Sequence, residues 1–241
     1  MQNYNEKIVG SNEGTSNAGL NSFFQRTYSF MMLAVAVSGV VAWMMSTVFE
    51  QQYVNMMTSM GSLTWIILMI AQFGIVFLIG RNSIKNPGAA FGGLMAFAIV
   101  EGFVLGSIFL IFDLGTIASA FAVAAVDFAA MALFGFFSKK NMAGMAPILF
   151  GATIALIISS VVNIFLHSSG MQWLISIAAI VIFSIWTMFD NNQLKNTYYQ
   201  MESAGITDYN GIAVNGALNL YMDFINIFIN LVYIFGGSSR N

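Results

Sequence analysis

Five polar side chains recur along one face of the last hydrophobic segment of the chain, around the run NLYMDFINIFINLVYIF. They are Asn215, Asn219, Asp223, Asn226 and Asn230. Their spacing of 4, 4, 3 and 4 residues places all five on one side of an α-helix. A carboxylate at the centre of a membrane helix costs at least ~2.5 kcal/mol. We therefore expect Asp223 to face the protein interior and to have a function there.

Three further carboxylates, Glu101, Asp127 and Asp190, fall within or at the end of other hydrophobic segments. No Lys or Arg lies deep in any of these segments, and the nearest cation is Arg81, at the end of the second. Four buried anions without cations cannot all be ionised in a medium of low dielectric constant. Some are protonated, or they share protons in pairs, or a cation lies among them. Each option predicts sensitivity to pH or to cations.

Asp190 and Asp223 are the predicted pair. The sixth hydrophobic segment ends near FDNNQLK, and the seventh starts on the same side of the membrane, so the two helices are expected to be antiparallel neighbours. Asp190 then approaches the Asp223 face, provided that the sixth helix extends past Asp190. Two carboxylates in contact share a proton. The competing interpretation is hydrogen bonding between helices with no further role, and for Glu101 and Asp127 both interpretations stay open.

Composition indicates a membrane protein. The chain has 241 residues, of which 58% are hydrophobic and only 7% charged, against about 25% charged in soluble domains. It has no cysteine and one histidine, His167, which excludes thiol chemistry and a histidine-rich metal site. A net charge of −2 without a basic cluster argues against nucleic acid as a partner. We expect no bound cofactor, and the lipid bilayer is the predicted surrounding.

Seven segments are long and apolar enough to span a bilayer, which needs about 20 residues. Their unbroken hydrophobicity predicts an all-α, polytopic membrane protein rather than a barrel. The polar N-terminal residues 1–21 are expected to be a disordered tail, residues 22–237 the transmembrane domain, and residues 238–241 a short C-terminal tail. The predicted spans are 28–49, 63–80, 89–112, 116–138, 145–166, 171–191 and 212–235.

The basic residues predict the orientation. Seven of the eight precede the first span or lie in alternate connections, whereas the other connections hold Glu50, Asp113 and His167 and no Lys or Arg. The positive-inside rule makes the basic side cytoplasmic. The N-terminus is then inside and the C-terminus, with Arg240, outside. The seven are Lys7, Arg26, Arg81, Lys85, Lys139, Lys140 and Lys195.

Two motifs resemble the Bax inhibitor family, the transmembrane Bax inhibitor motif proteins. FSIWTMFDNNQLK is similar to the block that ends the family's penultimate span, and ALNLYMDFINIFINLVYIFGG is similar to its C-terminal block. EGFVLGSIF in the third span resembles another family element. The resemblance covers residues 22–237. The compact chain looks like a bacterial member, which implies a multi-pass protein of the inner (plasma) membrane.

The resemblance implies a fold in which six helices surround a central seventh, and a calcium leak that responds to pH. Asp190 and Asp223 correspond to a proton-sharing gate that also offers oxygen ligands to Ca²⁺, and Arg81 is the candidate latch. Relatives carry a glutamate in the second span, where this chain has Gln72. The candidate pore-lining residues are Asn219, Asn226, Asn230 and Glu101.

Two functions remain in competition. The first is a pH-sensitive leak for calcium or another cation, gated by the aspartate pair, with calcium as the permeant ion. The second is a regulatory protein that binds a membrane partner, such as a membrane protease or a stress or cell-death regulator. An enzyme is not expected, because the GxGD motif of intramembrane aspartyl proteases is absent before Asp223, where Leu220, Tyr221 and Met222 stand. The last span also lacks the lysine that a retinal protein needs.

Overall fold

The fold is all-helical in a computed structural model that describes the backbone of residues 2–238 and the side chains of 18–81 and 83–237. No strand occurs within the described backbone. The α-helices are α1 (Gln2–Thr47), α2 (Glu50–Met60), α3 (Ser62–Asn82), α4 (Pro87–Ile111), α5 (Leu114–Phe137), α6 (Ala146–Leu166), α7 (Ser169–Ser203) and α8 (Asn210–Ser238).

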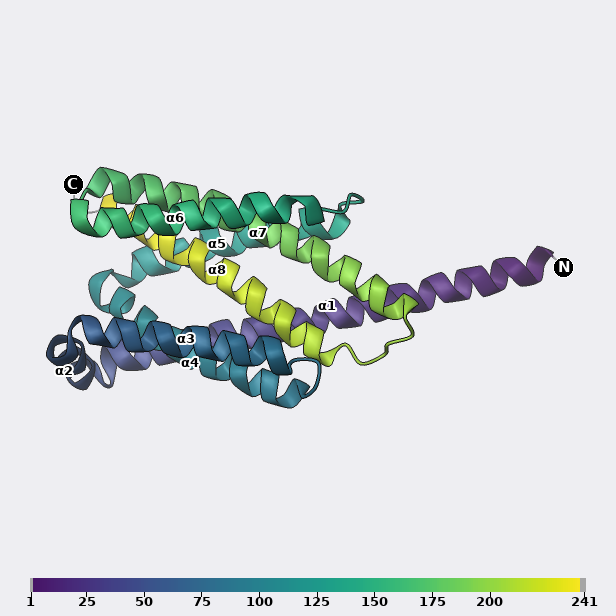
Figure 1. Ribbon diagram of the computed structural model, residues 1–241, viewed down its shortest axis with the longest axis horizontal. Helices are drawn as coiled ribbons and strands as arrows, with labels where there is room; N and C mark the ends of the chain where they lie inside the picture. Colours follow the sequence, from purple (N-terminus) through teal and green to yellow (C-terminus); the bar gives the residue numbers. More distant parts are fainter. Residues whose placement is uncertain (1, 239–241) are drawn as a thin grey trace.

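Helix α8 runs diagonally between two groups of helices (Figure 1). One group contains α1 to α4 and the other contains α5, α6 and α7. The spanning part of α8 is 56% buried, against 11% for α3 and α6. The expectation of a central last helix agrees with this arrangement.

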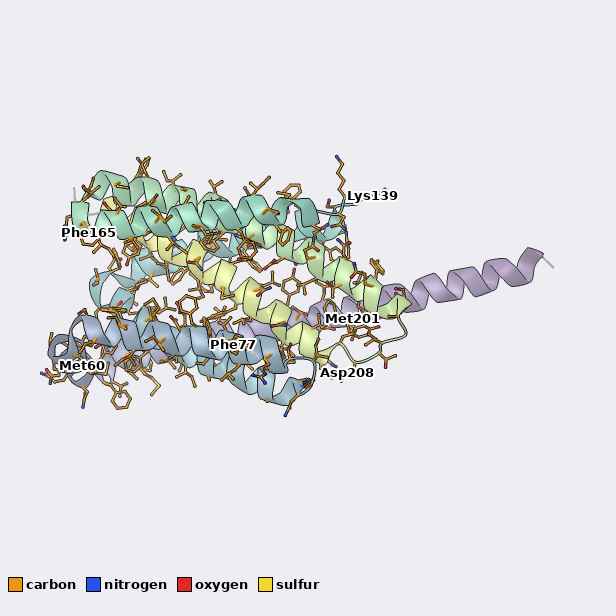
Figure 2. All side chains as sticks on the ribbon, in the orientation of Figure 1. Met60, Phe77, Lys139, Phe165, Met201 and Asp208 are labelled. Carbon is orange, nitrogen blue, oxygen red and sulfur yellow. The ribbon has the colours of Figure 1, made fainter. Side chains whose placement is uncertain are left out.

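Seven of the described helices are long and apolar enough to cross a membrane, which confirms the predicted polytopic fold. Lys139, Met201 and Asp208 lie at one end of the bundle, and Met60 and Phe165 at the other (Figure 2). We call the first the basic end, because the connections after α3 and α5 bring Arg81, Lys85 and Lys139 there.

Glycines bring helices close together on both sides of α8. A Cβ at Gly102 of α4 would lie 2.7 Å from the Ser38 carbonyl oxygen of α1, and at Gly135 of α5 it would lie 2.1 Å from the Met188 carbonyl oxygen of α7. Such contacts are typical of small residues between membrane helices. Gly92, by contrast, has nothing within 4 Å of its Cβ position.

Three elements differ from the expected boundaries. Helix α7 continues to Ser203, so the long connection predicted from Lys195 to Asn210 is mostly helical and only residues 204–209 join α7 to α8. The segment after the first span forms the short helix α2, whose Tyr53 hydroxyl donates to the Phe103 carbonyl of α4 at 2.8 Å. Helix α1 begins at Gln2, and Leu20 is already buried, whereas a tail to residue 21 was expected.

Candidate functional site

A polar cavity of about 370 Å³ lies between α7 and α8 near the basic end. Helix α7 contributes Asp190 and Thr197, and α8 contributes Asn215 and Asn219. The extension of α7 beyond Asp190 creates this cavity, because it supplies Gln193, Leu194 and Thr197 as one wall. Asp190 and the first part of the predicted polar face of α8 therefore line the same space.

Asp223 lies one helical turn beyond Asn219 and is buried, with 5% of its surface exposed. Its carboxyl oxygen Oδ2 is buried and has no hydrogen-bond partner within the described structure. The Asp223 carboxyl interacts electrostatically with that of Asp190, as predicted for antiparallel neighbours. Two neighbouring acids, one of them buried with an unbonded oxygen, form an arrangement that favours a shared proton or a bound cation.

Hydrogen bonds to the buried Asn192 fix the segment of α7 that carries Asp190. The Asn192 amide nitrogen donates to the carbonyls of Gly135 at 3.3 Å and Lys140 at 3.0 Å, and its Oδ1 accepts from the Met142 N–H at 3.0 Å. These contacts join α7 to the end of α5 and the connection that follows. The segment of α7 that carries Asp190 is thus held firmly against α5, in the group formed by α5, α6 and α7.

Lys195 belongs to the same motif but does not compensate Asp190 in this structure. Its ammonium donates to the carbonyls of Phe136, at 2.6 Å, and Ser138, at the C-terminal end of α5. A cation at this position stabilises the exposed carbonyls and the negative end of the helix dipole. The basic residue of the motif therefore serves helix capping.

Two contacts from α1 were not predicted from the sequence. The Tyr28 hydroxyl donates to Asn191 Oδ1, next to Asp190, and the Arg26 guanidinium donates to Asn210 Oδ1, at the first residue of α8. Asn191 lies directly beside the predicted site residue Asp190, whereas Asn210 starts the helix that carries Asp223. Consecutive amides in FDNNQ, within an apolar segment, are the available signal, but nothing in the sequence indicates that α1 supplies the partner of Asn191.

The remaining asparagines of the α8 face have different partners. Asn215 donates to the Ser83 hydroxyl at 3.1 Å, which joins the start of α8 to the end of α3. Asn226 and Asn230 each donate to a carbonyl of their own helix at 2.8 Å. Only Asn215 and Asn219 of the five line the cavity, so the polar face is continuous along the helix without forming one continuous cavity wall.

Three other predicted residues lie away from the pair. Arg81 is exposed at the end of α3, and within the described structure it has no hydrogen bond or ion pair to Asp190 or Asp223. Glu101 accepts a hydrogen bond from Gln72 of α3, and Asp127 accepts one from the Ser184 hydroxyl of α7 at 2.6 Å. The four membrane acids are therefore distributed over three places.

The donor set near Asp190 suits a transient cation better than a tightly held metal. No three His, Cys, Asp or Glu side chains come together within the described residues. Ca²⁺ takes six to eight oxygen ligands in stable protein sites. Two carboxylates with the amide oxygens of Asn215 and Asn219 reach six ligands only if both carboxylates bind through both oxygens, so otherwise water would have to complete the shell.

Comparisons with known proteins agree with the motifs. Residues 20–241 match the family described as inhibitor of apoptosis-promoting Bax1. The inner membrane protein YbhL of Escherichia coli is 31% identical over 223 residues, which cover 91% of this chain and 93% of that protein. YrjE of Lactococcus lactis is 33% identical over 223 residues, 92% of this chain and 94% of that protein. An uncharacterised membrane protein of Streptococcus pyogenes serotype M3 is 33% identical over 221 residues, with 92% and 95% coverage.

The family match spans nearly all the described helices, including α7 and α8 with their aspartates. Seven candidate spans and a relative named as an inner membrane protein place the chain among multi-pass membrane proteins. The chain belongs to the Bax inhibitor family.

Proposed function

We propose that this protein is a pH-sensitive leak for cations, with calcium as the principal ion, and that Asp190 and Asp223 form its gate. The observation that supports this most directly is the electrostatic pairing of the two aspartates beside a polar cavity, with Asp223 Oδ2 buried and unbonded within the described structure. A structural pair would be expected to have its oxygens satisfied by hydrogen bonds.

The gate works through the shared proton. With one proton held between Asp190 and Asp223, the carboxyls attract each other and the local charge is low. When that proton is released, the two negative charges repel each other and present hard oxygen ligands to a divalent cation. Cation entry therefore increases as pH rises through the titration of the pair.

The proposed orientation places the cavity on the cytoplasmic side. The basic residues in the described connections gather at the end of the bundle where α8 starts, and the positive-inside rule makes this end cytoplasmic. Asp223 then separates a cytoplasmic cavity from the more apolar second half of α8. In this arrangement Arg81, at the same end, is a candidate latch whose engagement with the pair requires movement of α3 or its side chain.

Calcium flux into liposomes tests the proposal. The purified protein is reconstituted with a calcium indicator inside, and initial rates are recorded between acidic and mildly alkaline pH. The wild type should conduct faster as pH rises. The double variant Asp190→Asn, Asp223→Asn should lose this pH dependence, because an amide cannot release a proton.

Asp127→Asn is the matched control, because Asp127 is a membrane acid of α5 that bonds Ser184 and does not line the cavity. Its flux and pH profile should follow the wild type. A wild-type rate no higher than that of empty liposomes would overturn the leak. A double variant with the wild-type pH profile would overturn the gate.

A further inference from the structure

Glu101 forms a second buried acid site, on the side of α8 opposite the aspartate pair. Its side chain is 8% exposed and accepts a hydrogen bond from the Gln72 amide of α3. It also interacts electrostatically with Tyr221 of α8. Tyr221 and Asp223 are two residues apart, which is about 200° around a helix, so they face opposite sides at nearly the same depth.

A set of hydroxyl contacts joins Tyr221 to the α1–α4 group. The hydroxyls of Tyr221 and Ser38 are hydrogen-bonded at 2.5 Å, and Ser38 Oγ lies 2.9 Å from the Ala98 carbonyl oxygen of α4. The Tyr221 ring packs edge-on against Phe97, with the ring centroids 5.9 Å apart. Ser38 and Tyr221 are both fully buried. The centre of α8 is thus bonded to α1 and, through Ser38, linked to α4, the helix that carries Glu101.

Among the described residues, no cation neutralises Glu101 at this depth. Helix α4 packs against α1, α3 and α8. The sequence has no Lys or Arg between Arg26 and Arg81, nor between Lys195 and Arg240. Arg81 is exposed and nine residues beyond Gln72, about 14 Å along α3.

The polar side chains that contact Glu101 or its neighbours on α4 are neutral. Gln72 comes from α3, Ser38 from α1 and Tyr221 from α8, and Tyr53 of α2 donates to the Phe103 carbonyl. An isolated ionised carboxylate in such surroundings costs several kcal/mol. The group avoids this cost by keeping its proton.

We propose that Glu101 is a second proton-binding site, protonated in the resting protein, and that release of its proton loosens the contact between α8 and the α1–α4 group. Ionisation creates a negative charge beside the Tyr221 hydroxyl and the carbonyls that Ser38 contacts, and water must enter to solvate it. Water can reach the charge if α8 separates from α1 and α4. Any change in conduction that this loosening causes rests on the proposed function of α8 in gating. The protonation of Glu101 and the loosening of the helix contact do not rest on it.

Infrared spectroscopy measures the protonation directly. The chain has five glutamates, and Glu101 is the one within a predicted span, so ¹³C labelling of glutamate separates its carboxyl band from those of the aspartates. The labelled wild type at neutral pH should show the band of a protonated carboxyl, and this band should vanish in Glu101→Gln. It should persist in the Asp190→Asn, Asp223→Asn variant. A wild type without this band at neutral pH would overturn the site.

Thiol labelling measures the loosening. The chain lacks cysteine, and Ala217 is fully buried four residues before Tyr221, on the same face of α8. In Ala217→Cys protein, the rate of labelling by a water-soluble maleimide is compared with that in a second protein that also carries Glu101→Gln. Because thiol reactivity itself rises with pH, the ratio of the two rates is the readout.

The ratio should rise several-fold above neutral pH, because only the protein with Glu101 gains a charge there. A ratio that stays constant from acidic to alkaline pH would overturn the coupling to α8. Neither this ratio nor the infrared band depends on calcium flux. Absence of calcium flux would therefore reject the proposed leak. It would not affect the proton site at Glu101, which the infrared band and the labelling ratio test.

Discussion

The two sides of α8 differ in how their polar groups are satisfied. Towards α7, Asp223 has an unbonded buried oxygen near a cavity of about 370 Å³. Towards α1 and α4, the Tyr221 hydroxyl is bonded to Ser38, and Gly102 allows α1 and α4 to approach closely. A cavity and an unsatisfied acid favour rearrangement, whereas close packing and completed hydrogen bonds resist it.

This difference indicates which contact can change first. The α7 side can bind a proton or a cation and has space in which to do so. The α1–α4 side holds α8 in place and would move only after Glu101 is ionised. The central helix is therefore expected to respond to pH at two sites, the aspartate pair on its open side and Glu101 on its closely packed side. The predictions below test the contrast between a closely packed side and an open one.

The largest expected effect comes from overpacking the close side. In Gly102→Ala, the new Cβ lies 2.7 Å from the Ser38 carbonyl oxygen and 2.7 Å from the Val41 Cβ, so α1 must shift. Overpacking of this kind costs about 1–3 kcal/mol. Thermal unfolding in detergent should show a clear loss of stability. Gly92→Ala is the control on the same helix, because its Cβ meets nothing within 4 Å and alanine favours helix. Equal stabilities for the two variants would contradict the close α1–α4 contact.

An intermediate effect is expected on the open side, in the pH dependence of stability. The folded wild type holds the proton shared by Asp190 and Asp223 at a pH at which the unfolded chain has already released it. The free energy of unfolding of the wild type therefore falls as pH rises. Carboxylates that share a proton interact by more than about one pK unit, which corresponds to roughly 1.4 kcal/mol. Asp223→Asn cannot form two charges, so it should be more stable than the wild type above neutral pH.

The same thermal unfolding assay, repeated across pH, gives this comparison. At acidic pH the wild type and Asp223→Asn should be similar, and their curves should separate as pH rises. Asp127→Asn should run parallel to the wild type, because Asp127 is bonded to Ser184 and lies outside the pair. Parallel curves for Asp223→Asn would mean that the pair does not hold a shared proton.

The sequence predicted most of the helical architecture because hydrophobic length is a local signal. It also predicted that α7 and α8 are neighbours, and α7 continues past Asp190 to Ser203, whereas the sharing of a proton by Asp190 and Asp223 stays a prediction. It did not predict that Lys195 caps α5, or that Tyr28 reaches Asn191. These contacts join residues more than 50 positions apart, and no periodicity within one helix encodes them.

Glu101 shows the same limit for a single residue. Its position in the third span follows from the sequence, but its partner Gln72 is 29 residues earlier and its neighbour Tyr221 is on the last helix. The resemblance singles out Gln72 as the residue that stands where relatives carry a glutamate, but it does not indicate that Gln72 bonds Glu101. Which helix faces which is decided by packing, so the separation of Glu101 from the aspartate pair required the structure.

The smallest expected effect tests whether hydrogen bonding on the close side contributes beyond packing. Tyr221→Phe keeps the ring against Phe97 and removes only the hydroxyl. Ser38 Oγ still lies 2.9 Å from the carbonyl oxygens of Ala34 and Ala98, so it keeps an acceptor. The loss of stability should be about 1 kcal/mol, the usual net value of one hydrogen bond. Thermal unfolding measures it, and a loss as large as that of Gly102→Ala would mean that the hydroxyl, rather than the close helix contact, holds α8 against α1 and α4.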